Sequence, residues 1–143
     1  MGVTIKCKKT GREMDVGYFG FHKLRAKIAE LVSPKVGKHY QMYDGIFSMT
    51  SPAKEHALKS YNDETERLIE RKELSIKIAD FLYQSDCGGK IRDGACKDIL
   101  RVVGDYDNRV IYGYAGRENP ARFKDFKEIL KDCVDNKCFM VWE

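Results

Sequence analysis

Both ends of the chain carry the alternating pattern of β-strands, and this feature limits the fold more than any other. Residues 3–7 alternate apolar and polar side chains, and residues 14–16 resume the alternation after a turn at Gly11. Such alternation is typical of a strand with one buried face, and a glycine between two such runs predicts a β-hairpin. The run "CFMVW" at residues 138–142 predicts a final strand. We therefore expect strands from the two ends of the chain to form one small sheet.

Helical spacing of apolar residues predicts about five helices between these strands. Their predicted boundaries are residues 21–32, 52–73, 74–84, 93–103 and 120–134. The stretch "RVIY" at residues 109–112 predicts one more strand, whereas "SDCGGKIRDG" at residues 85–94 predicts a glycine-rich connection between helices. Residues 35–51 show no clear period beyond a short helix around His39. The whole pattern predicts the α+β class, with the N-terminal hairpin and C-terminal strands forming a small antiparallel or mixed sheet that packs against the helices.

The length of the chain, 143 residues, fits a single domain (1–143) built around one hydrophobic core. No apolar run comes near the roughly 20 residues that a membrane-spanning helix needs. The opening residues, "MGVTIKCKKTG", lack the basic segment and apolar stretch of a secretory signal. We therefore expect a cytoplasmic protein without a membrane partner.

The net charge of the chain is only +4, and acidic residues are interspersed with the basic ones. Nucleic-acid binding would favour a concentrated basic face. The charge pattern therefore gives no strong nucleic-acid signal, but it leaves room for a local anion site.

Five cysteines are present, an odd number that argues against a disulfide framework in a reducing cytosol. Cys87, Cys96, Cys133 and Cys138 could together hold zinc, although structural zinc usually takes more closely spaced pairs. Cys96 and Cys133 also lie on apolar faces of predicted helices, where a free cysteine is simply a small buried side chain. We expect no metal site and no cofactor, and the spacing leaves the zinc alternative open.

Catalytic signatures are also missing from the sequence. None of the three histidines lies in a recognisable motif, and a nucleophile needs a base within hydrogen-bond reach. The "GGK" at residues 88–90 lacks the earlier glycine and the following serine or threonine of a phosphate-binding loop. We therefore expect that the protein is not an enzyme.

The loop "RVIYGYAGRENP", residues 109–120, is the strongest candidate for a binding site. Tyr112 and Tyr114 stand on either side of a glycine, so their rings can offer a stacking face while the glycine lets a ligand approach the backbone. Arg109 and Arg117 add positive charge, and Arg117 precedes a predicted helix N-terminus, which favours an anion. A planar base with phosphates would suit this loop.

A second corner, "GYFGFHKLR" at residues 17–25, repeats the composition of that loop. Tyr18 and Phe19 lie between glycines, and Arg25 follows on the next helix. The two corners could converge on one ligand. Alternatively, the tyrosines fill gaps at the sheet edge and the glycines only form turns, and the sequence leaves both interpretations open.

The phrases "TGREMDVGYFGFHKLRAKIAEL", "DFLYQSDCGGKI", "VVGDYD", "YGYAGR" and "FKDFKEILKDC" resemble small proteins encoded in phages and prophages of Gram-positive bacteria. The similarity runs through most of the chain, and it transfers no site residue. Phage accessory proteins of this size often act in counter-defence, as sponges for nucleotide immune signals or as inhibitors of host nucleases.

This resemblance implies two hypotheses of different classes. The first is an oligomeric, non-enzymatic sponge that sequesters a small nucleotide ligand of the cyclic nucleotide or cyclic ADP-ribose class in the host cytoplasm. The second is a protein inhibitor of a host defence nuclease, comparable to anti-CRISPR proteins, that makes contact through the charged helix from Ala53 to Glu73. A structural or regulatory phage accessory without either activity is a third possibility.

Overall fold

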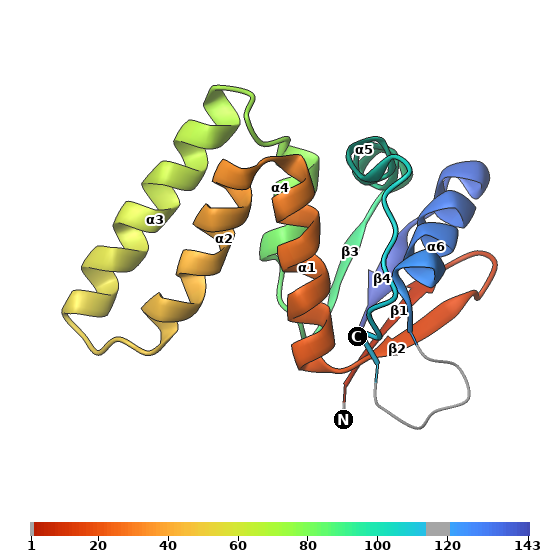
Figure 1. The fold of residues 1–143 in the computed structure, drawn as a ribbon, viewed down its shortest axis with the longest axis horizontal. Helices are drawn as coiled ribbons and strands as arrows, with labels where there is room; N and C mark the ends of the chain where they lie inside the picture. The colour runs from red at the N-terminus through yellow and green to blue at the C-terminus, as the bar shows by residue number, and fades with distance from the viewer. Residues whose placement is uncertain (1, 114–120) are drawn as a thin grey trace.

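A computed structural model describes residues 2–113 and 121–143, and it has the α+β architecture that the sequence predicts (Figure 1). Four strands form one antiparallel sheet in the order β2-β1-β4-β3. The strands are β1 (Val3–Cys7), β2 (Glu13–Val16), β3 (Gly89–Ile91) and β4 (Met140–Trp142). Within the described ranges, six helices accompany them: α1 (Tyr18–Val32), α2 (Pro34–Phe47), α3 (Ala53–Glu70), α4 (Ile76–Tyr83), α5 (Asp93–Val103) and α6 (Phe123–Asn136). The predicted N-terminal hairpin and C-terminal strand are therefore confirmed.

The two ends of the chain pair directly, with Ile5 opposite Trp142 in neighbouring strands. Because side chains alternate along a strand, this register places most apolar residues of the four strands on one face of the sheet, with Val141 on the other. The buried side chains of that face are Val3, Ile5, Cys7, Met14, Val16, Ile91, Met140 and Trp142. Lys6 and Lys90 point to the opposite face and are exposed. The sheet thus has one buried face and one face open to water.

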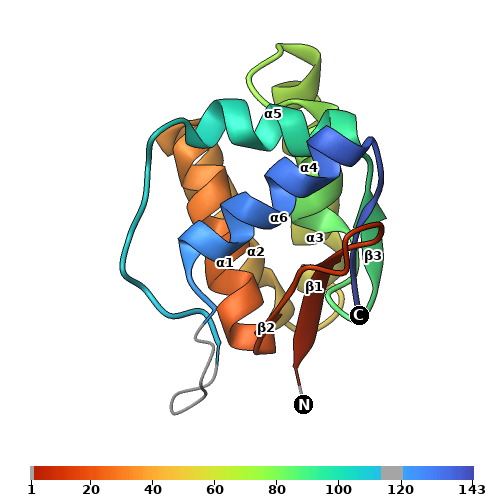
Figure 2. The same cartoon turned by 90° about the vertical axis from the view of Figure 1, so that its right-hand side faces the viewer.

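Helices cover the buried face of the sheet, and their aromatic rings meet over Trp142. The ring centroid of Trp142 lies 5.7 Å from that of Phe21 in α1 and 5.7 Å from that of Phe81 in α4. Phe81 lies in turn 5.6 Å from Phe126 of α6. Figure 2 shows α5 and α6 on the side of the sheet that this core occupies. One aromatic cluster therefore joins three helices to the sheet.

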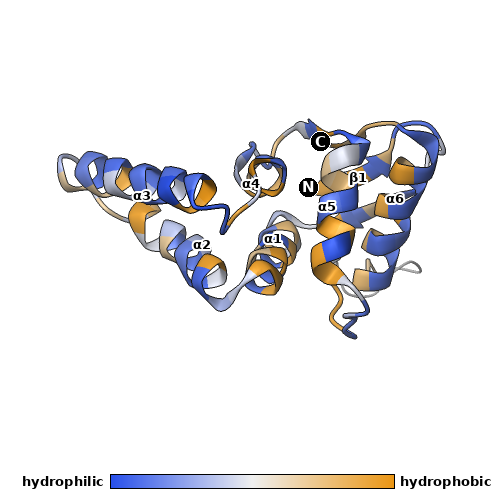
Figure 3. Cartoon of the chain, turned by 90° about the horizontal axis from the view of Figure 1, so that it is seen from above, coloured by the Kyte–Doolittle hydropathy of each residue, from blue (hydrophilic) through white to orange (hydrophobic). Residues whose placement is uncertain are grey.

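Helices α2 and α3 form a hairpin that projects from this core (Figures 1 and 3). Ser33 ends α1 and also begins α2, because its side chain accepts a hydrogen bond of 3.1 Å from the backbone N–H of Val36. A stack of His39 on Tyr61, with centroids 4.0 Å apart, holds the two helices together. The hydroxyl of Tyr61 lies 2.7 Å from that of Tyr83, which ties the hairpin to α4.

The expected strand at residues 109–112 is wrong, because among the residues that the structure describes this segment pairs only through an isolated bridge between Ile111 and Arg122. The strand that was not predicted is β3. It lies within the segment that the sequence predicts to be a connection between helices. The side chain of Gln84 accepts a hydrogen bond from the backbone N–H of Lys90 (3.1 Å) and donates one to its carbonyl (2.8 Å). The Gln84 side chain thus satisfies the hydrogen-bonding groups of Lys90 in a very short edge strand. Such a strand can form without an alternating apolar and polar sequence.

Helix boundaries also differ from the prediction in the first half of the chain. Helix α1 begins at Tyr18, so the corner "YFGF" is its first turn, and α2 runs through residues 34–47, where only a short helix was expected. The predicted cap at Asn119 and Pro120 lies outside the described residues.

Candidate functional site

The two glycine and aromatic corners meet in the structure. Gly20, in the first turn of α1, lies against the backbone carbonyl of Tyr112. Gly113 lies against the backbone carbonyl of Asp15 at the end of β2 and against Ala121. The segment at residues 112–113 is therefore wedged between α1 and the sheet edge, and the glycines are required because side chains would not fit.

Two of the predicted ligand-binding side chains lie in the core. Tyr112 is only 3% exposed, and its hydroxyl accepts a hydrogen bond of 2.9 Å from Asn108. Burial raises the pKa of Tyr112, so the ring stays neutral. Arg25 is 6% exposed, with its guanidinium 4.2 Å from the ring of Phe21, and burial lowers its pKa. Both side chains support packing and neither is presented to a ligand from solvent.

The other predicted residues lie at the surface or outside the described ranges. Tyr18 and Phe19 are exposed at the start of α1, and Phe19 is 71% exposed, with the Lys23 ammonium 4.9 Å from its ring centroid. Tyr114 and Arg117 lie outside the described residues. Arg109 is exposed and lines a pocket.

This basic pocket has a volume of about 400 Å³ and lies where the chain enters α6. It is lined by Asp107, Asn108, Arg109, Ile111, Arg122 and Lys124. The bridge between Ile111 and Arg122 holds its two walls together. The side chain of Asn108 accepts a hydrogen bond of 3.0 Å from the backbone N–H of Val110, which fixes the turn that carries Arg109. Three cations therefore surround one cavity with a single carboxylate.

The charges of the basic pocket oppose the ordinary preference of a helix start. The N-terminus of a helix carries partial positive charge and favours acidic side chains. Arg122 is nevertheless the N-cap residue of α6, and Lys124 lies in its first turn. Asp125 compensates in part, since it accepts a hydrogen bond of 2.9 Å from the backbone N–H of Arg122. Basic side chains at the positive end of a helix conflict with local helix preferences, and such conflicts are typical of functional sites. A bound anion would offset the repulsion between these positive charges.

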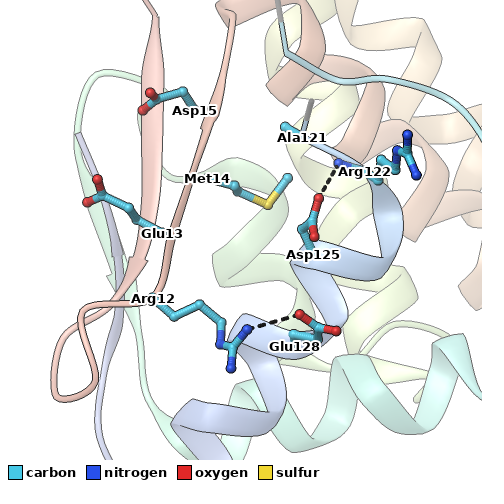
Figure 4. Close-up of a pocket in the computed structure, with 8 residues that line it drawn as sticks. All are labelled: Arg12, Glu13, Met14, Asp15, Ala121, Arg122, Asp125 and Glu128. Carbon is cyan, nitrogen blue, oxygen red and sulfur yellow. Dashed lines mark hydrogen bonds and ion pairs between the residues drawn. The ribbon is translucent and has the colours of Figure 1, made fainter. Parts of the chain in front are cut away.

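A second hollow adjoins the basic pocket and has the opposite character (Figure 4). It measures about 460 Å³ and is lined by Arg12, Glu13, Met14, Asp15, Ala121, Arg122, Asp125 and Glu128. Arg12 already forms ion pairs with Glu128 (3.0 Å) and Asp132 (2.8 Å). Four carboxylates against two guanidinium groups make this hollow unsuited to a phosphate, so the basic pocket is the better anion site.

Sequence reasoning missed Arg122 and Lys124. The signal was present, because the stretch "ARFKDF" places two basic residues at the start of the clearest amphipathic helix. Their convergence with Arg109 depends on the Ile111 bridge, which no local pattern reveals.

The described residues also contain one cluster that could hold a metal. The Sγ atoms of Cys7, Cys133 and Cys138 lie within 4.8 Å of one another. Of the four cysteines considered from spacing, Cys87 is exposed and Cys96 is buried, and both lie outside this cluster. A hydrogen bond with Cys96 and burial raise the pKa of Cys133. The third thiol of the cluster is Cys7, which lies at the other end of the chain and was not among those four.

The chain matches no known protein-family model, no curated protein and no solved structure at a significant level. Across the described residues, none of the helices has the length and apolar character to cross a membrane.

Proposed function

We propose that this protein is a non-catalytic binding protein whose basic pocket takes a phosphate-bearing small molecule of the nucleotide class. The observation that carries the proposal is the convergence of Arg109, Arg122 and Lys124 on one cavity at the start of α6. A volume of about 400 Å³ lies within the usual range of small-molecule sites, roughly 300–1,000 Å³. Guanidinium groups suit phosphate because they donate two parallel hydrogen bonds.

The uncharged lining supports a nucleotide rather than a bare phosphate. Ile111 is 49% exposed and offers an apolar surface to a base. Sequestration of an immune-signalling nucleotide in the cytoplasm of an infected host, by an oligomer of this chain, is the role that the resemblance to phage proteins favours.

The test is a thermal-shift screen of the purified protein against cyclic di- and trinucleotides and cyclic ADP-ribose isomers. A compound that binds the folded state raises the melting temperature. We expect at least one such compound, and we expect to recover it intact after heating the protein. Arg109→Ala and Arg122→Ala should abolish the shift, and Lys59→Ala on the distant helix α3 should not. A shift unaffected by both arginine variants would contradict this site, and conversion of the compound would contradict a non-catalytic role.

The α2–α3 hairpin favours a second candidate, a protein inhibitor of a host nuclease. The second half of α2 and the loop after it expose large apolar side chains, namely Met42 (58%), Phe47 (59%) and Met49 (39%). The hairpin that carries them projects from the core (Figure 3). Exposed apolar groups gathered in this way are typical of protein-binding surfaces. The charged residues of α3 would then provide the rim of the contact.

Size-exclusion chromatography with purified host defence nucleases tests this candidate. A stoichiometric complex that Phe47→Ser disrupts would support it, provided that the variant keeps the stability of the wild-type protein. A complex that survives both Phe47→Ser and Met42→Ser would exclude these apolar side chains as the contact.

A further inference from the structure

We propose that Cys7, Cys133 and Cys138 form a binding site for a thiophilic divalent cation of the zinc class. This site is separate from the basic pocket and does not rest on the proposed function. Helix α6 separates them, because Lys124 lies near its start and Cys133 near its end. Lys124 and Cys133 are nine positions apart (133 − 124), so at about 1.5 Å per residue the helix separates the two sites by roughly 14 Å along its axis.

The geometry of the three sulfur atoms is the first reason. The Sγ atoms of Cys7 and Cys138 lie 3.4 Å apart, and the Sγ of Cys133 is within 4.8 Å of both. A tetrahedral zinc ion with Zn–S bonds of about 2.3 Å holds its sulfur ligands about 3.8 Å apart. The thiols therefore need only small shifts to reach ligand positions.

The way the chain brings these thiols together is the second reason. Cys7 ends β1, and Cys133 lies in the last turn of α6. Lys137 adopts a left-handed conformation with φ of 50° immediately after α6, which folds Cys138 back toward Cys133 so that its N–H donates to the Cys133 carbonyl (3.1 Å). Three segments separated by up to 131 positions thus converge on one point.

The turn after β1 is the third reason. Gly11, with φ of +76°, permits this turn, and its backbone N–H donates a hydrogen bond of 3.0 Å to the Cys7 carbonyl. The backbone that carries Cys7 is therefore fixed on both sides of the residue, because the Cys7 N–H also donates to the Arg12 carbonyl (2.9 Å). Ligands that are already positioned lose less conformational freedom when an ion binds.

Packing alone accounts less well for this cluster. A cysteine that serves only as a small core residue needs no second thiol at 3.4 Å. Cys138 is only half-buried, so an ion can reach the cluster from solvent. Three protein ligands leave the fourth tetrahedral position to water.

Cobalt titration of the full chain, reduced and freed of metal under anaerobic conditions, tests the proposal. We expect one equivalent of Co²⁺ to produce thiolate-to-cobalt charge-transfer bands in the near ultraviolet, and Zn²⁺ to remove them. Cys138→Ser should weaken zinc binding by more than roughly 100-fold, because even outer-shell partners of metal ligands cost about 10- to 100-fold. Cys87→Ser, which changes an exposed thiol outside the cluster, is the matched control and should bind as the wild-type protein does.

Stability provides a second readout. Zn²⁺ should raise the melting temperature of the wild-type protein and of Cys87→Ser by several degrees, and that of Cys138→Ser not at all. If Cys7→Ser fails to fold, Cys138→Ser still decides the matter, because its side chain is half-exposed at a turn. Three results would each overturn the proposal: no cobalt bands with folded wild-type protein, equal loss in Cys87→Ser and Cys138→Ser, or a Cys7–Cys138 disulfide in protein freshly purified without reductant.

Discussion

Gly20 of α1 lies so close to the backbone carbonyl oxygen of Tyr112 that a methyl group added at Gly20 would overlap that oxygen. The obstacle is main chain and cannot rotate away. Since the same contact sets the position of the chain that enters the basic pocket, it connects the packing of α1 with the geometry of the candidate site.

Gly20→Ala should therefore destabilise the protein by about 1–3 kcal/mol, the usual cost of overpacking a rigid site. Urea unfolding followed by the fluorescence of Trp142, the single tryptophan, measures this change. Gly45→Ala is the matched control, because Gly45 is also helical but has open space around it. That variant should gain about 0.5–1 kcal/mol from reduced backbone entropy. Equal stability of the two variants would mean that the backbone near Tyr112 can shift away from a methyl group at position 20 at little cost in free energy.

Ligand binding at the basic pocket should depend on salt and on individual cations. For a compound found in the nucleotide screen, Arg109→Gln and Arg122→Gln should each weaken affinity about 10- to 100-fold, since a charged hydrogen bond contributes about 1.5–3 kcal/mol. Affinity should also fall as ionic strength rises, because exposed charges are screened over about 10 Å at 0.1 M salt. Calorimetric titration at several salt concentrations checks both effects. Salt-independent affinity would contradict an electrostatic pocket.

Arg25→Lys should destabilise the fold by about 1–3 kcal/mol and leave ligand affinity unchanged. The Arg25 guanidinium lies over the ring of Phe21, at 4.2 Å from its centroid, and 5.5 Å from that of Trp142, and a strongly hydrated ammonium is a poorer partner for aromatic rings. Arg25→Met is the control, because an apolar side chain of similar length avoids a buried charge and should cost less than lysine. Denaturant unfolding ranks the three proteins. Wild-type stability in the lysine variant would show that these ring contacts contribute little.

His39 should make the folded state sensitive to mild acid. Its Nε2 lies 2.8 Å from Oγ1 of Thr65, whose hydroxyl proton is directed to the Tyr61 carbonyl, so Nε2 must carry the proton of the neutral ring. Protonation at Nδ1 would then charge a side chain that is only 7% exposed. Burial lowers the pKa of His39 below its ordinary value near 6.5, and the nearby Glu64 only partly opposes this effect.

The unfolded state therefore binds the His39 proton at higher pH than the folded state. The contribution of neutral His39 to stability is fully present above about pH 6.5 and declines as the pH falls through the pKa of the folded state. Urea unfolding between pH 8 and 5 should show a steeper loss of stability for the wild-type protein than for His39→Gln. His56→Gln changes an exposed histidine and should keep the wild-type slope. The same slope in all three proteins would contradict this account.

Local patterns predicted the parts of the fold that depend on local interactions. The hairpin around Gly11 and the apolar face of α6 follow from periods of two and 3.6 residues, and both are observed. β3 was not predicted because the Gln84 side chain hydrogen bonds to the backbone of Lys90 in that strand. An interaction of this kind produces no alternating pattern in the sequence. The same limit applies to the site. Tyr112 and Arg25 have the composition of ligand-binding residues, and only tertiary packing shows that they are buried.

The position of β4 has a consequence for the order in which the molecule can fold during synthesis. β4 lies between β1 and β3, so neither of those strands has this neighbour until residues 140–142 have been made. Until then β1 pairs only with β2, and its other edge offers unpaired backbone groups to any passing strand. The nascent chain must keep that edge apart from other nascent chains while every helix is translated, which makes the unfinished chain a candidate substrate for chaperones. The three residues of β4, which are translated after helices α1 to α6, thus decide when the edge of β1 is protected from aggregation.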